Sequence, residues 1–216
     1  MSKRVSLGRR RIWQAALAPL ALSVLAACDK ATPGASPEVK FNAVDITGAA
    51  YARQFKLNDV DGHPRSLAEF QGKVVFVFFG FTQCPDVCPT TMADLAEVRR
   101  RLGPDGERLQ GVFITIDPER DTPDVLKAYL QAMDPGFVGL RGSLAETEAA
   151  SREFKVFYQK VPTQAGQYTM DHTAGAFVFD PAGQVRLFVR YGLGAEALTA
   201  DIKALLAQAP APKPSA

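Results

Sequence analysis

Two cysteines four positions apart, Cys84 and Cys88, separate an apolar run from a helical pattern. The run 74–79 is β-branched and aromatic, which predicts a buried strand. Pro89 suits the first turn of the helix that follows. Two thiols between a strand and a helix can exchange a disulfide or bind a soft metal ion. Three intervening residues distinguish this pair from the two-residue spacing of thioredoxin-type reductases.

The predicted helix start should affect the second cysteine most. The first N–H groups of a helix are unpaired and its dipole is positive there, so we expect the thiolate to form at Cys88, at or next to the N-cap. Cys84 belongs to the preceding loop, where its sulfur can lie close to that of Cys88. A disulfide across so short a loop removes little unfolded-state entropy, which favours a chemical role over a structural one.

A third donor would define the chemistry further, and the chain has two histidines. His172 precedes a predicted strand, 176–179; in a thioredoxin-like fold the loop before that strand approaches the active-site helix. Two thiolates and an imidazole suit copper in both oxidation states, whereas zinc would lack a fourth protein ligand. From the residues alone, His172 is either a ligand or a surface or packing residue. His63 lies in a predicted turn and is interpreted as solvated.

Acidic residues follow one predicted strand and precede the candidate histidine. Segment 117–123 comes directly after the strand predicted at 112–116. Asp117 is a candidate for holding a ligand in place through a hydrogen bond, or belongs to a post-strand loop in which Thr122 is the N-cap of the next helix. Asp171 either orients the adjacent histidine or caps a turn.

Strands and helices alternate along the central part of the chain. Strands are expected at 55–60, which continues into a turn at 61–62, and at 74–79, 112–116, 137–140, 176–179 and 185–191. Helices are expected from Pro89 to about 102, at 122–133 with an apolar face of Val125, Leu126, Tyr129, Leu130 and Met133, at 144–154, and around 198–206. This order predicts an α/β protein with a thioredoxin-like fold: a central mixed sheet flanked by helices, with an N-terminal β extension.

The N-terminus has the pattern of a signal for export. Residues 1–27 combine five basic residues, no acidic residue and a short apolar stretch, and end in Leu-Ala-Ala before Cys28. This junction resembles a bacterial lipobox, which predicts lipidation of Cys28; the alternative is an ordinary cleaved signal. We expect a lipoprotein signal peptide at 1–27, a lipid-anchored flexible tether at 28–40, a copper-binding domain at 41–208 and a disordered tail at 209–216. The predicted location is the periplasm or outer side of the cytoplasmic membrane.

The charge balance argues against one class of partner. The 216-residue chain has 25 basic and 23 acidic residues, but without the five basic residues of 1–27 the counts become 20 and 23. A slightly acidic mature protein gives no support for nucleic-acid binding.

Three separate segments together resemble the Sco/SenC copper chaperones: 81–89, 117–123 and 171–173. The resemblance covers about 41–206. It implies a thioredoxin-like domain that binds one Cu(I) or Cu(II) ion through Cys84, Cys88 and His172.

The resemblance also implies a role in cytochrome c oxidase assembly. The partners would be the copper-bearing subunit with its copper-A site, an upstream copper donor protein and the membrane. By the resemblance, Cys84 and Cys88 would deliver copper, reduce the acceptor's cysteines, or do both. Competing hypotheses are an exported thiol-disulfide oxidoreductase and a copper or redox sensor without transfer. A thiol peroxidase is disfavoured because Pro85 occupies the position where such sites have Thr or Ser.

Overall fold

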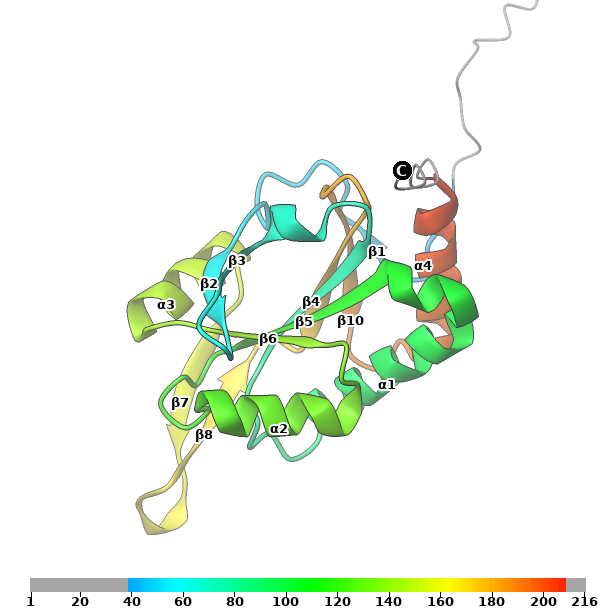
Figure 1. Ribbon diagram of the computed structural model, residues 1–216. Helices are drawn as coiled ribbons and strands as arrows, with labels where there is room; N and C mark the ends of the chain where they lie inside the picture. The colour runs from blue at the N-terminus through cyan, green and yellow to red at the C-terminus, as the bar shows by residue number, and fades with distance from the viewer. Residues whose placement is uncertain (1–38, 209–216) are drawn as a thin grey trace, which may run out of the picture. The chain divides into compact units, whose positions relative to one another are not determined.

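The computed structural model describes residues 39–208, in which eight strands form one mixed sheet (Figure 1). The middle strands β4, β5 and β6 are parallel, and the other pairings are antiparallel. The order across the sheet is β1 (Val44–Asp45), β10 (Val185–Arg190), β9 (Gly175–Phe179), β4 (Val74–Gly80), β5 (Leu109–Thr115), β6 (Val138–Arg141), β2 (Lys56–Asp59) and β3 (Pro64–Ser66). The β2–β3 hairpin is the predicted N-terminal β extension.

Four α-helices of the described segment flank this sheet. They are α1 (Val87–Leu102), α2 (Pro123–Met133), α3 (Leu144–Glu153) and α4 (Ala195–Gln208), with short 3-10 turns at Leu67–Phe70, Gly103–Arg108 and Gln164–Gly166. Helix α1 contacts α2 and α4, whereas α3 contacts β2. The predicted thioredoxin-like arrangement, a central mixed sheet with flanking helices, is confirmed.

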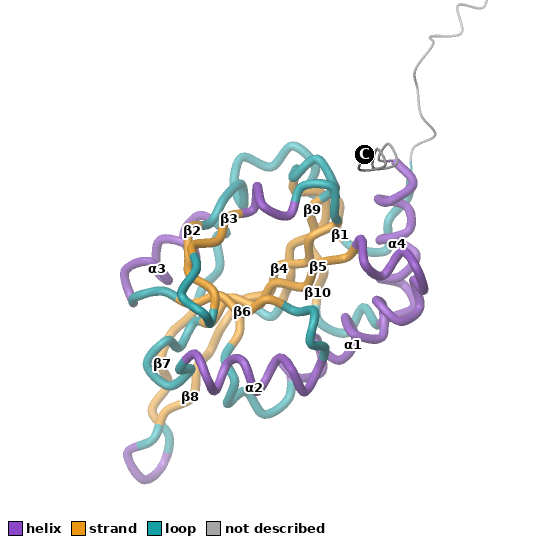
Figure 2. The backbone as a smooth tube through the Cα atoms, viewed as in Figure 1, coloured by secondary structure: helices purple, strands orange, loops and turns teal. Residues whose placement is uncertain are grey.

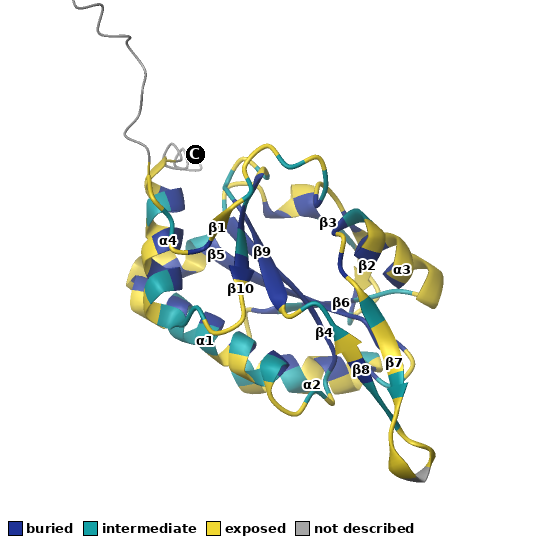
Figure 3. Cartoon of the chain, turned by 180° about the vertical axis from the view of Figure 1, so that it is seen from behind, coloured by how far each residue is buried: buried dark blue, intermediate teal, exposed yellow. Residues whose placement is uncertain are grey.

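The core is built around β4 and β5, in which every residue is buried (Figure 3). Successive side chains of a strand point to opposite faces. Phe79 lies on the side of α3, where its ring centroid is 5.1 Å from that of Phe154. Phe78 points the other way and packs on Phe113 at 6.0 Å. The strand that ends at the cysteine loop is therefore fixed on both faces.

Helix α2 begins as predicted, but its apolar face is narrower. Thr122 is the N-cap, and its hydroxyl accepts a hydrogen bond from the Val125 N–H at 3.4 Å. Leu126 and Leu130 are buried. Val125 is 43% exposed, so its assignment to the buried face was wrong. It lies in the first turn of the helix, on the side that faces solvent.

The sequence did not predict a second, two-stranded sheet formed by β7 (Tyr158–Pro162) and β8 (Tyr168–His172). Figure 2 shows this hairpin extending away from the main sheet, with a 3-10 turn at its tip. Most of its residues are exposed or half-buried, so no clear apolar alternation marks it. His172 therefore ends a strand and does not lie in a loop.

Several predictions fall outside the described residues. They concern the signal peptide at 1–27, nearly all of the tether at 28–40, lipidation of Cys28 and the tail at 209–216. Within 39–208, no helix is long and apolar enough to cross a membrane.

Candidate metal centre

The two cysteines lie where β4 passes into α1. Cys84 is in the connecting loop and half-buried, while Cys88 is fully buried in the first turn of the helix. Both are free thiols. Gly80, the last residue of β4, allows the close approach: a Cβ atom there would lie 3.0 Å from the Cys88 Sγ and 2.8 Å from the Phe78 ring. Position 80 must therefore lack a side chain for the Cys88 sulfur to fit.

The N-terminus of α1 stabilises the sulfur of Cys84 in the preceding loop, and not the sulfur of Cys88 within the helix. The backbone N–H of Cys88 donates to the Cys84 Sγ at 3.3 Å, so Cys84 takes one of the unpaired donors of the first turn. Hydrogen bonds from the Cys88 side chain and backbone lower the pKa of Cys84 to about 5. The neighbouring Cys84 sulfur and burial raise the pKa of Cys88. The expectation of a thiolate at Cys88 is corrected: the first proton leaves Cys84.

His172 reaches the same point from β8, 84 positions further along the chain. Its Nε2 lies 3.6 Å from the Cys88 Sγ, and its Nδ1 lies 3.1 Å from the Thr173 carbonyl oxygen. A carbonyl only accepts, so Nδ1–H donates to it, and Nε2 is the ring nitrogen that faces the sulfurs. The ring packs edge-on against Phe78 and Phe81, with centroids at 6.1 and 5.9 Å.

These three side chains fit the geometry of one metal site. Each offers one donor atom, and the three atoms lie within 4.8 Å of one another. Bonds of about 2.3 Å to sulfur and 2.0 Å to nitrogen, as for zinc, place donors about 3.5–4.0 Å apart around a single ion. Two soft sulfurs and one imidazole suit copper in both oxidation states. The three residues singled out in the sequence are thus brought together.

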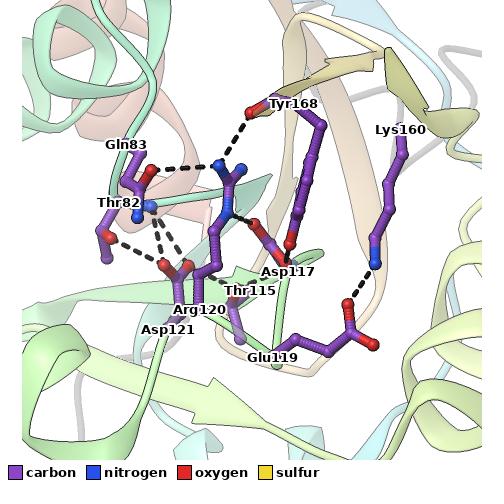
Figure 4. A network of polar contacts seen from close by, with 9 residues as sticks. All are labelled: Thr82, Gln83, Thr115, Asp117, Glu119, Arg120, Asp121, Lys160 and Tyr168. Carbon is purple, nitrogen blue, oxygen red and sulfur yellow. Dashed lines mark hydrogen bonds and ion pairs between the residues drawn. The ribbon is translucent and has the colours of Figure 1, made fainter. Parts of the chain in front are cut away.

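Asp121 anchors the cysteine loop, a role that the sequence did not single out. Its carboxylate accepts hydrogen bonds from the Thr82 N–H at 3.1 Å, the Thr82 hydroxyl at 2.6 Å and the Thr115 hydroxyl at 2.5 Å (Figure 4). Burial raises the pKa of Asp121, and these hydrogen bonds oppose the rise. The cysteine loop is therefore held to the end of β5. The only sequence signal for this role was that Asp121 belongs to the segment 117–123.

The two acids proposed to support the ligands differ in their surroundings. Asp117 is buried and accepts a hydrogen bond from the Tyr168 hydroxyl at 2.9 Å, at the start of the strand that bears His172. Asp171 is exposed and has no hydrogen-bond or ion-pair partner among the described side chains. The Thr173 carbonyl takes the place expected for Asp171, because β8 turns the Asp171 side chain away from the ring.

The comparisons with known proteins agree with this geometry. The family model SCO1/SenC matches residues 44–207. The chain belongs to the SCO1/SenC family. A curated family relative, Protein SCO2 homolog, mitochondrial, of Mus musculus, is 41% identical over 140 residues, covering 63% of this chain and 54% of that protein. The present chain therefore matches about half the length of the mouse protein.

Solved structures of the family resemble it over most of its length. Bradyrhizobium japonicum ScoI with copper bound is 40% identical, with a TM-score of 0.65, and the match covers 71% of this chain and 98% of that one. BsSco, a member of the Sco family of cytochrome c oxidase assembly proteins, is 21% identical, with a TM-score of 0.59, and the match covers 77% and 99%. At that identity, BsSco supports the fold alone.

Proposed function

We propose that this protein is a copper carrier that binds one copper ion through Cys84, Cys88 and His172. The observation that carries the proposal is the convergence of two sulfurs and one imidazole nitrogen within 4.8 Å. The sulfurs favour Cu(I), and the nitrogen helps to retain Cu(II). Copper is the cargo, and the half-buried Cys84 gives an acceptor's ligands a route to replace those of the carrier.

The test is an anaerobic copper titration of the reduced protein. We expect one equivalent of copper, with thiolate-to-Cu(II) absorption. Cys84→Ala or Cys88→Ala should abolish tight binding of both oxidation states, whereas His172→Ala should weaken Cu(II) more than Cu(I) because the thiolate pair remains. The matched control is His63→Ala, since the side chain of His63 is 70% exposed. Undiminished Cu(II) binding by His172→Ala would contradict the three-donor site.

We further propose that the recipient is the copper-A site of cytochrome c oxidase. Membership of the SCO1/SenC family, for which the resemblance implies a role in cytochrome c oxidase assembly, supports this recipient. A deletion strain should lose oxidase activity and regain it when copper is added to the medium. Unchanged activity in that strain would contradict the assembly role.

A second activity, reduction of an acceptor disulfide, is favoured by the ionisable Cys84. The Cys84 thiolate would attack the acceptor disulfide, and the Cys88 thiol would resolve the mixed disulfide, leaving a Cys84–Cys88 disulfide and a reduced acceptor. Two electrons pass to the acceptor in this exchange. It requires no metal, so His172→Ala should retain it, while either cysteine variant should lose it. A sensor without transfer would show neither reaction with the acceptor.

A further inference from the structure

Arg120 joins the two segments that carry the donor atoms. Its Nη1 donates to the Gln83 side-chain oxygen at 3.0 Å and to the Tyr168 carbonyl oxygen at 2.8 Å (Figure 4). Gln83 directly precedes Cys84, and Tyr168 is the first residue of the strand that ends at His172. A single nitrogen atom thus connects the cysteine loop to the histidine strand.

Three further contacts fix the orientation of this guanidinium. It forms an ion pair with the buried carboxylate of Asp117. Its central carbon lies 3.8 Å from the centroid of the Tyr168 ring and 5.9 Å from that of Phe81. A planar, multidentate arginine loses its function when replaced even by lysine in such a setting, because lysine presents a single point charge. The Asp117 carboxylate therefore holds the edge of the guanidinium, and the two aromatic rings hold its face.

The energetics of this arginine favour a geometric role. Its side chain is 18% exposed, and its Nη2 is buried without a hydrogen-bond partner among the described residues. An unpaired buried donor lowers stability, and buried ion pairs add little net stability. Stability alone therefore does not account for an arginine at position 120.

The histidine strand needs such a tertiary connection. Strands β7 and β8 form a two-stranded sheet separate from the main one, and an isolated two-stranded hairpin is marginal in water. At its outer part, Lys160 of β7 forms an ion pair with Glu119, the neighbour of Arg120. The segment around Arg120 therefore contacts both strands of the hairpin.

We propose that Arg120 is a positioning residue that sets the distance between the sulfur pair and His172. The inference rests on the proposed function for the identity of the metal, but the positioning itself is a property of the metal-free protein. Without Arg120, the direct connection between the hairpin and the cysteine loop would be lost, and the 3.6 Å approach of the His172 Nε2 to the Cys88 Sγ would lengthen.

The first test uses Arg120→Gln without metal, in the reduced protein. Nuclear Overhauser effects between the rings of Phe81 and His172, whose centroids are 5.9 Å apart, report the position of the strand. The matched control is Arg99→Gln, because Arg99 is 14% exposed and likewise pairs with a carboxylate, that of Asp134. We expect the ring contacts to disappear in Arg120→Gln and to persist in Arg99→Gln.

The second test uses copper with the same two variants. Partners behind metal ligands change metal affinity by about 10- to 100-fold, so Arg120→Gln should weaken Cu(II) by that factor while Cu(I) binding by the sulfur pair stays near normal. Arg120→Lys should not restore Cu(II) binding, because lysine cannot span both acceptors. Arg99→Gln should leave both affinities unchanged.

Each outcome bears on one proposal. Unchanged ring contacts and an unchanged ratio of Cu(II) to Cu(I) affinity in Arg120→Gln would overturn the positioning role, even if the melting temperature falls. If the parent protein binds no copper, the carrier proposal fails, and the ring contacts still decide the role of Arg120. If Arg120→Gln does not fold, Gln83→Leu removes only the loop-side connection and must then show the same two effects.

Discussion

At the scale of the residue, the two thiols differ because one is a hydrogen-bond acceptor at a helix start and the other is buried. Cys84 accepts the N–H of Cys88, whereas Cys88 has no exposed surface. The first turn of a helix therefore acts on the sulfur that lies beyond its end, as a capping group, and not on a sulfur inside the turn. The more acidic thiol is also the more accessible one.

This asymmetry predicts the pH dependence of thiol alkylation in the reduced, metal-free protein. Iodoacetamide reacts with the thiolate, and the pKa of Cys84 is lowered to about 5. The reaction should be slow when Cys84 is protonated, rise as the pH rises through that pKa, and level off above about pH 6. Mass spectrometry should locate the first modification on Cys84.

The control for this experiment is Cys84→Ala. It leaves Cys88, which is buried and loses its partner, so we expect slow alkylation without a plateau in the acidic range. A half-maximal rate near the ordinary value of about 8.5, or first modification on Cys88, would contradict the assignment.

At the scale of the element, the passage from β4 into α1 depends on Gly80. The last residue of the strand faces the buried sulfur, and any side chain there would occupy the space of the Cys88 Sγ and the Phe78 ring. Strand, glycine and helix thus form one unit in which packing and donor position are coupled.

Gly80→Ala should therefore disturb both stability and metal binding. Overpacking a buried site costs about 1–3 kcal/mol, which urea denaturation can measure. The displaced Cys88 sulfur should weaken copper binding in a titration of the same variant.

Gly139→Ala in β6 is the matched control. Its added Cβ would lie 2.8 Å from Leu130 and 2.9 Å from Leu126, so it should lower the free energy of unfolding similarly. Its neighbours are core leucines of α2, and copper affinity should stay normal. Equal copper affinity in the two variants would show that Gly80 does not control the position of the copper donors.

At the scale of the whole molecule, the described domain carries its candidate site where β4 passes into α1, while the sequence before the domain has the pattern predicted for an export signal. The pattern Leu-Ala-Ala-Cys28 predicts a lipid on Cys28, outside the described residues. Each buried methylene of an acyl chain contributes about 0.8 kcal/mol, so more than one chain would hold the protein stably at a membrane.

Cys28→Ser tests the anchor. We expect the native protein in the membrane fraction with incorporated labelled palmitate, and the variant without label. Copper binding by the variant should equal that of the native protein, since Cys84, Cys88 and His172 are intact. Native protein without label, or label that persists in Cys28→Ser, would contradict lipidation of Cys28.

The sequence by itself determined the frame of the site. The run 74–79 and the helical spacing of Met92, Leu95 and Val98 are local patterns: the first reflects a strand buried on both faces, and the second reflects a helix buried on one face. They placed Cys84 and Cys88 between a buried strand and a helix. The alternation of strands and helices gave the fold class for the same reason.

Only the tertiary structure decided how that frame is completed. The β7–β8 hairpin is mostly exposed, so its pairing leaves little periodic signal along the chain. Arg120 contacts residues 37 positions before it and 48 after it, and such contacts follow from the packing of segments that are distant in sequence. The choice of Cys84 as the acidic thiol depends on hydrogen bonds from the Cys88 side chain and backbone at the helix start. Local patterns fix burial and period, whereas distances between separate segments exist only after the chain has folded.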